Sequence, residues 1–294
     1  MPDGFLQAGV ITAIVTPFLE GGAIDWDRLG AEADILDRAP ADGICAGGVL
    51  GDSAGMAPDE LFSVCEAVRS RTRKPLFAMI FPDTESEGIE MARAVVSGGA
   101  TAIFLAQPHY LCQPEPEGLA AMFVSIRDKV GVPLLLANCL STSMLSRAGI
   151  ELLIRERAID GILQGGDIHL LIDLLGSHCG LPVYSGVEDL HYVALLLGAA
   201  GVVSDLATVF PSEVAGLYQA CREGRHDAAR KSHERLARVW RALDHPYEQR
   251  LRLRAALAAR GRDVGAPRSP YDLKEFDTKG EVRAALQAEG LVTV

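Results

Sequence analysis

The sequence predicts a (β/α)8 TIM barrel, an α/β fold, followed by a C-terminal extension of three helices. Three observations lead to this fold class. Eight short apolar runs alternate with longer segments of helical period, the runs are continuously apolar, and the strand signal ends near residue 210. Continuous apolar runs are typical of parallel strands covered by helices. Eight such units in one chain favour a barrel.

The expected strands fix the place of every other element. They span residues 9–16, 43–50, 75–81, 102–106, 133–138, 161–164, 182–185 and 201–204. Between them, Asp25 can cap one helix and Pro58 can open the next. Glycines at 98–99 and at 198 mark connections from a helix to the following strand.

The remaining residues, 211–294, show no strand signal. Their apolar pattern is helical, with breaks near residues 244–246 and 261–270, which predicts three helices. We therefore expect residues 1–210 to form the barrel and residues 211–294 to form a helical extension.

Composition narrows the function classes. The chain has 294 residues, 49% of them hydrophobic, which is enough to bury a large core. A formal charge of -11 repels phosphate backbones, so nucleic acid is excluded as an expected partner. The longest apolar stretches, such as residues 193–203, are too short to cross a bilayer of about 30 Å, and no basic segment precedes the first apolar run. We expect no membrane association and a cytoplasmic location.

The six cysteines are scattered through the chain without C-x-x-C spacing. This pattern indicates reduced thiols, not a disulfide framework or a zinc site. Most of them are expected to serve as small core residues.

The segments that follow the strands are the candidate site, because barrel enzymes build their active sites at that end of the barrel. Several of them form recognisable motifs: Thr16-Pro17-Phe18, Gly48-Val49-Leu50-Gly51-Asp52-Ser53, Pro108-His109-Tyr110, Leu136-Ala137-Asn138, Gly161-Ile162-Leu163-Gln164 and Ser185-Gly186. Their order resembles the dihydrodipicolinate synthase and N-acetylneuraminate lyase family. The resemblance continues into the extension with Arg254-Ala255-Ala256-Leu257, Gly261 and Arg268-Ser269-Pro270.

This resemblance implies carbon–carbon lyase or aldolase chemistry on small 2-oxo acids, in which a lysine on the sixth strand forms a Schiff base with pyruvate or a related ketone. Here that position holds Leu163, or Gln164 if the alignment gap moves by one residue. Neither side chain can condense with a ketone, and glutamine can only hydrogen-bond a carbonyl. None of the five lysines follows a predicted strand: Lys74, Lys129, Lys231, Lys274 and Lys279. We expect Schiff-base activity to be absent.

Other positions implied by the resemblance are substituted as well. The family's two hydroxyl residues after the second strand correspond to Val49 and Leu50, and its fifth-strand tyrosine corresponds to Ala137. The family's substrate-binding arginine falls near Thr142. The predicted pocket is therefore more apolar and larger than that of the family, so a ligand bulkier or less polar than pyruvate is expected.

Tyr110 and His109 are the remaining candidates for catalytic groups. Tyr110 matches a tyrosine of the family's fourth-strand motif, and a packed rim tyrosine is the alternative. His109 could act as an acid or base, and a solvated loop histidine is the alternative. The candidate substrate-binding residues are Asp52, Ser53, Asn138, Gln164, Ser185 and Gly186.

Three further features are candidate sites. Carboxylates after the strands could together hold a divalent metal, but those at 52 and 189 have structural counterparts in the family, so no metal and no cofactor is predicted. These carboxylates are Asp52, Asp83, Glu188, Asp189 and Asp205. Cys139 could be a nucleophile, and a core thiol is the alternative. Gly165-Gly166-Asp167 could bind an anion or simply allow a tight turn.

Two functions stay open at this point. One is an enzyme that binds a small oxo-acid or aldehyde and uses acid–base or metal chemistry without a lysine adduct. The other is a catalytically inactive barrel that binds a metabolite or assembles with a partner, and fold alone does not decide between them. The resemblance also implies a homo-oligomer, either a dimer or a tetramer.

Overall fold

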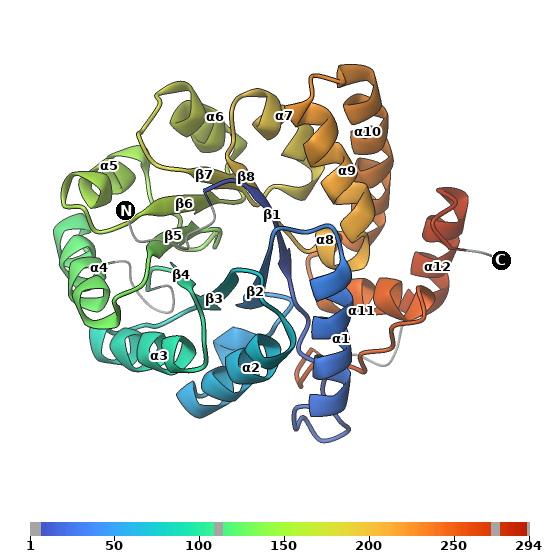
Figure 1. Cartoon of the computed structure of the whole chain (residues 1–294), viewed down its shortest axis with the longest axis horizontal. Helices are drawn as coiled ribbons and strands as arrows, with labels where there is room; N and C mark the ends of the chain where they lie inside the picture. Colours follow the sequence, from blue (N-terminus) through green and yellow to red (C-terminus); the bar gives the residue numbers. More distant parts are fainter. Residues whose placement is uncertain (1–6, 109–113, 272–276, 293–294) are drawn as a thin grey trace.

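The computed structural model describes residues 7–108, 114–271 and 277–292. In it, eight parallel strands close into a barrel in chain order, with the last strand paired to the first (Figure 1). The predicted barrel is confirmed. The strands are β1 (Gly9–Ala13), β2 (Gly43–Gly47), β3 (Leu76–Ile80), β4 (Ala102–Leu105), β5 (Leu134–Asn138), β6 (Gly161–Gln164), β7 (Val183–Ser185) and β8 (Gly201–Ser204).

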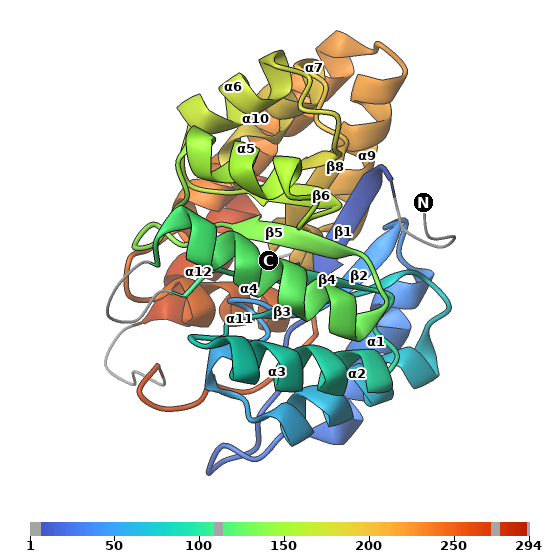
Figure 2. The same ribbon diagram turned by 90° about the vertical axis from the view of Figure 1, so that its left-hand side faces the viewer.

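Helices connect the strands and cover the outside of the barrel (Figures 1 and 2). As predicted, the Asp25 side chain caps the first helix by accepting a bond from the Arg28 N–H at 3.1 Å, and Pro58 is the first residue of the second. The barrel helices are α1 (Trp26–Arg38), α2 (Pro58–Arg71), α3 (Glu85–Ser97), α4 (Pro116–Val130), α5 (Arg147–Arg155), α6 (Ile168–Gly176) and α7 (His191–Leu196). Two single turns, η1 (Ser53–Gly55) and η2 (Glu188–Leu190), follow β2 and β7.

Residues at alternate strand positions pack on opposite sides of the barrel wall. Leu135, Ala137 and Leu163 belong to the core inside the barrel. Leu136 and Ile162 belong to the core between the strands and the helices. This alternation follows from the two-residue period of a strand, and it decides which side chains reach the mouth of the barrel.

Four helices, not three, follow residue 210 within the described residues: α9 (Pro211–Arg222), α10 (His226–Leu243), α11 (Gln249–Ala259) and α12 (Thr278–Ala288). The sequence analysis missed the break at 223–225, where Gly224 has a φ of 69°. The short α8 (Leu206–Val209) and α9 cover β1 and β8, so α10 to α12 form the helical extension seen beyond the barrel in Figure 1. A domain division at residue 210 stays a prediction.

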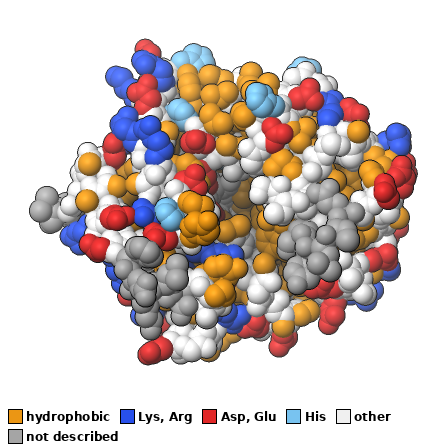
Figure 3. Space-filling view, turned by 180° about the vertical axis from the view of Figure 1, so that it is seen from behind, with side chains coloured by type: hydrophobic (Ala, Val, Ile, Leu, Met, Phe, Trp, Pro, Cys, Tyr) orange, Lys and Arg blue, Asp and Glu red, His pale blue; other side chains and the backbone are white. Residues whose placement is uncertain are grey.

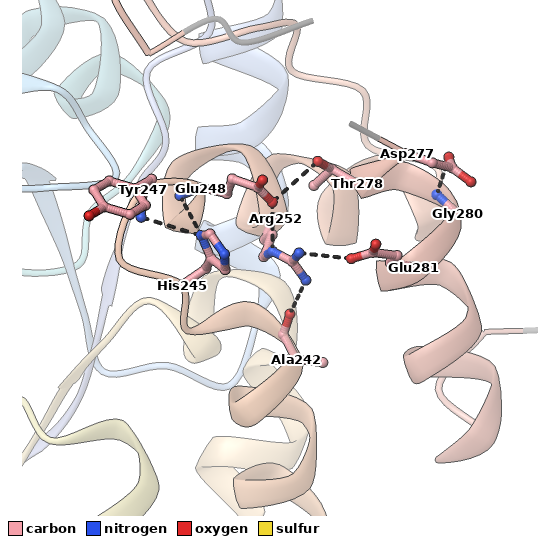
Figure 4. Close-up of polar contacts among 9 residues, drawn as sticks. All are labelled: Ala242, His245, Tyr247, Glu248, Arg252, Asp277, Thr278, Gly280 and Glu281. Carbon is pink, nitrogen blue, oxygen red and sulfur yellow. Dashed lines mark hydrogen bonds and ion pairs between the residues drawn. The ribbon is translucent and has the colours of Figure 1, made fainter. Parts of the chain in front are cut away.

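The extension is joined to the barrel by an apolar core and by ion pairs. Leu50, Phe210 and Trp240 lie in one cluster with residues of α9 to α12. Within the extension, Arg252 of α11 donates to Glu248 at 3.0 Å and to Glu281 of α12 at 2.8 Å (Figure 4). These contacts make the three helices one packed unit.

The described residues bear on two expectations from composition, which concern the state of the cysteines and the presence of a membrane-spanning helix. Five cysteines are free thiols there: Cys45, Cys65, Cys139, Cys179 and Cys221. In the same residues, none of the helices has both the length and the apolar character needed to cross a membrane.

Candidate functional site

A cavity of about 210 Å³ lies at the carboxyl ends of the strands. Figure 3 shows a hollow near the middle of the face that lies behind the view of Figure 1. Its described walls come from all eight strand ends except that of β4, together with two residues of the extension. They are Ala13, Cys45, Gly47, Gly48, Val49, Met79, Cys139, Leu163, Gly165, Gly166, Gly186, Glu188, Val203, Ser204, Asp205, Trp240 and Gln249.

The walls are mostly apolar. Leu163, Val203 and Met79 contribute hydrocarbon from inside the barrel, and Val49 borders the opening with 37% of its surface exposed. Among the described residues of the wall there is no lysine or arginine. The cavity therefore suits a small, largely uncharged molecule.

The described lysines lie away from this cavity. Lys74 precedes β3, and its amine donates to the Leu36 and Ala39 carbonyls at 2.9 and 2.6 Å. That contact lies at the end of the barrel opposite the cavity. The others belong to α4, α10 and α12: Lys129, Lys231 and Lys279. Lys274 lies outside the described residues.

The structure distinguishes between Leu163 and Gln164. Leu163 packs inside the barrel and lines the cavity. The Gln164 side chain accepts a bond from the Asn138 amide at 2.8 Å and donates to the Gly165 carbonyl at 2.8 Å. Because consecutive strand residues face opposite sides, the position from which β6 presents a side chain to the cavity is that of Leu163.

Gln107, Asn138 and Gln164 form a buried network of amides across the ends of β4, β5 and β6. The Gln107 amide donates to the Asn138 oxygen at 3.2 Å, and that oxygen also accepts the Leu145 N–H at 2.8 Å. The Asn138 amide donates in turn to Gln164. These bonds hold the segment after β5 against the barrel. The three amide side chains therefore stabilise the loops around the cavity and do not line the cavity itself.

Asp52 and Ser53 are also engaged in the fold. Asp52 pairs with Arg250 at 3.0 Å and with Arg254 at 3.1 Å, and burial raises the pKa of Asp52 against the opposing effect of the two arginines. The Ser53 hydroxyl accepts the Gly48 N–H at 2.8 Å and donates to the Met79 carbonyl at 2.9 Å. Both residues shape the turn that carries Val49.

The other predicted positions lie around the cavity in different ways. Ser185 is buried, and its hydroxyl accepts the Val187 N–H at 3.3 Å. Gly186 lines the wall. Ala137 is fully buried inside the barrel, whereas Leu50 packs with the helices of the extension.

Two predicted catalytic candidates, His109 and Tyr110, lie outside the described residues. Within the described residues, no group of three or more histidine, cysteine or carboxylate side chains could hold a metal ion. Burial raises the pKa of the Cys139 thiol to about 12, with Asp205 adding to the rise. The thiol is therefore protonated near neutral pH, which disfavours the alternative of a nucleophile.

Asp205, which the sequence analysis considered only as a metal ligand, lies on the cavity wall at the end of β8. Burial and the nearby Glu188 carboxylate raise the pKa of Asp205 to about 7. Asp205 stands two residues after the inward-facing Val203, and that spacing could have placed it in the site from the sequence.

Glu188, in contrast, is fully engaged. Its carboxylate accepts bonds from the Ser204 hydroxyl at 2.7 Å and the Leu206 N–H at 3.3 Å, and it pairs with His191 at 3.0 Å. Of the two neighbouring carboxyls, Asp205 is the one whose side chain makes no hydrogen bond or ion pair in the described residues.

The comparison with known sequences decides the family. The sequence profile of the dihydrodipicolinate synthetase family matches residues 6–289. The chain belongs to the dihydrodipicolinate synthetase family. The 4-hydroxy-tetrahydrodipicolinate synthase of Pseudomonas aeruginosa is 32% identical over 245 residues, which cover 80% of this chain and 82% of that protein. The synthase of Archaeoglobus fulgidus is 28% identical over 295 residues, covering 97% and 99%.

Solved structures give the same assignment. The dihydrodipicolinate synthase of Cyanidioschyzon merolae, determined with lysine bound, has a TM-score of 0.87 and 25% identity and covers 98% of this chain and 99% of that one. The N-acetylneuraminate lyase of Fusobacterium nucleatum has the same TM-score of 0.87 at 16% identity, covering 98% and 100%. The second likeness shows the fold alone. This dihydrodipicolinate synthetase family member thus has the barrel seen in the solved synthase structures.

Proposed function

We propose that this chain binds a small carbonyl compound in the cavity at the carboxyl ends of its strands and does not form a lysine adduct with it. The observation that carries this proposal is Leu163, which occupies the inward-facing end position of β6. A leucine cannot condense with a ketone, and without an amine there is no iminium to accept the electrons of a neighbouring carbanion. The classical reaction of the family therefore lacks its electron sink.

The cavity retains a group that can donate or accept a proton. The chain is therefore proposed to be a lyase- or aldolase-like protein. The Asp205 carboxyl has its pKa raised to about 7, which is near the best value for an acid or base at neutral pH. Tyr110 and His109 remain proposed additional groups. A cytoplasmic location and a homo-oligomeric state remain proposals drawn from the family.

Reductive trapping tests the absence of the adduct. The purified protein is incubated with pyruvate and borohydride, and its intact mass is measured. A Schiff base is reduced to a stable secondary amine, so a mass gain of one reduced pyruvate would overturn the proposal. We expect no gain in the wild-type protein, and the Leu163→Lys variant is the matched control for a lysine at that position.

A thermal-shift screen tests the ligand. Small aldehydes, ketones and 2-oxo acids are added to the protein, because a ligand of the folded state raises its stability by RT ln(1 + [L]/Kd). A reproducible rise for one chemical class supports the proposal. A protein that shows no rise with any compound would instead be a catalytically inactive barrel with a role in assembly.

A further inference from the structure

The cavity offers few polar side chains to a bound molecule. Ser204 donates its hydroxyl to Glu188, and Glu188 is held by three further groups. Among the described residues of the wall, the Asp205 carboxyl, the Gln249 amide and the Trp240 indole N–H have no side-chain hydrogen bond or ion pair in the structure. These side chains are therefore free to contact a ligand, and the Asp205 carboxyl is the one among them whose protonation changes near neutral pH.

The charged side chains that line the described wall of the cavity have one sign. Glu188 and Asp205 are its two acidic wall residues, and no described wall residue carries a positive charge. An anion that enters such a cavity loses its hydration without gaining an ion pair, which costs several kcal/mol. A 2-oxo-acid anion is therefore poorly matched to this wall.

We infer that Asp205 is the ligand-binding group of the cavity: its protonated carboxyl donates a hydrogen bond to the carbonyl oxygen of an uncharged aldehyde, ketone or ester. This inference rests on the proposed function, because it needs a ligand in that cavity, and it names the ligand's charge and the residue that recognises it. The apolar side chains of Leu163 and Val203 contact the rest of the molecule.

The protonation of Asp205 makes this binding depend on pH. The titratable groups that face Asp205 are Glu188 of η2, Cys45 of β2 and Cys139 after β5. His191 of α7 pairs with Glu188 and does not contact Asp205 directly. Burial raises the pKa of both thiols, so they stay neutral between pH 6 and pH 8. With a pKa of about 7, Asp205 is mostly protonated at pH 6 and mostly ionised at pH 8.

The test measures binding of two matched probes, methyl pyruvate and pyruvate, to the whole protein at pH 6 and pH 8. Ligand-observed NMR gives the dissociation constants. We expect methyl pyruvate to bind at least tenfold more tightly than pyruvate at pH 6, and to lose about tenfold in affinity at pH 8. Equal affinities for the two probes, or binding of methyl pyruvate that does not change with pH, would overturn the inference while the proposed function stands.

Three variants assign the effect to Asp205. Asp205→Asn keeps a donor and cannot ionise, so its binding of methyl pyruvate is expected to be the same at both pH values. Asp205→Leu removes the donor and is expected to lose at least tenfold in affinity at pH 6. Asp189→Asn changes an exposed carboxylate of η2, next to Glu188, and is the control that keeps wild-type behaviour.

Binding of methyl pyruvate by Asp205→Leu as tight as that of the wild type also contradicts the inference. If neither probe binds the wild-type protein at either pH, both the inference and the proposed carbonyl ligand fail. Circular dichroism of each variant shows that a loss of binding is not a loss of folding. A trapped adduct in the wild type, by contrast, refutes the proposed function alone.

Discussion

The carboxylate of Asp52 pairs with the guanidinium of Arg254 at 3.1 Å across 202 residues of sequence. Both side chains are buried, with exposed fractions of 6% and 4%. The same guanidinium donates to the Thr16 carbonyl at 2.8 Å and to the Val264 carbonyl at 3.1 Å. One arginine of α11 thus joins the ends of two barrel strands to the extension.

Replacing Asp52 by Asn is expected to destabilise the protein by about 3–5 kcal/mol. The change leaves the buried Arg254 charge without its carboxylate, and an unpaired buried charge is costly. Denaturant unfolding followed by circular dichroism measures the effect. Asp59→Asn, at an exposed position of α2, is the control and is expected to change stability by less than about 1 kcal/mol. A change of similar size in both variants would contradict this interpretation of the pair.

Replacing Asn138 by Ala is expected to cost about 1–3 kcal/mol, because Gln107 and Gln164 lose their buried partner. The segment after β5 also loses the bond from the Leu145 N–H. Hydrogen exchange of residues 139–145 should therefore become faster in the variant. The control is Gln219→Ala on the exposed face of α9, for which an effect below about 0.5 kcal/mol is expected.

Replacing Leu163 by Lys is expected to create an amine that pyruvate and borohydride modify. Burial in an apolar wall lowers the pKa of a lysine and so supplies the neutral amine that attacks a ketone. Adding Val49→Thr and Ala137→Tyr is expected to increase the trapped fraction, whereas Leu50 packs away from the cavity and is left unchanged. Intact-mass spectrometry gives the yield, with the wild-type protein and its five lysines as the control. A folded triple variant without adduct would show that the cavity no longer admits pyruvate.

The raised pKa of Asp205 predicts a pH dependence of stability. An acid whose pKa is higher in the folded state stabilises the fold below its unfolded value of about 4, and this contribution is lost as the pH rises through about 7. The wild-type protein should therefore lose a few kcal/mol relative to Asp205→Asn between pH 4 and pH 8. Unfolding midpoints of both proteins measured across this range check the sign. An increase in wild-type stability relative to the variant over the same range would contradict it.

The sequence was sufficient for the barrel because its signals are local. Continuous apolar runs predicted all eight strands, and β6 and β8 begin and end where expected. The first two strands end about three residues early, and for β2 the reason is that Gly47 and Gly48 adopt φ values of 84° and 76°. The helix break at Gly224 was missed because its neighbours are ordinary helix-compatible polar residues.

The site was less accessible from the sequence, since it depends on which side of the wall each residue faces. Val49 and Leu50 are neighbours with similar side chains, yet Val49 borders the cavity and Leu50 packs under helices more than 150 residues later. Local patterns do not contain such distant contacts. Along β6, the alternation of side chains does decide whether Leu163 or Gln164 faces the cavity, once it is known which side of the barrel wall one residue of the strand faces.

Trp240 and Gln249 bring the extension to the rim of the cavity. The barrel therefore has no finished binding site until its last helices have folded onto it, although every strand of that barrel is already complete by residue 204. During synthesis, the first 204 residues emerge before the part of the chain that closes the cavity. A chain that ends before the extension is therefore expected to keep the barrel of this family and to lack the residues that complete its cavity.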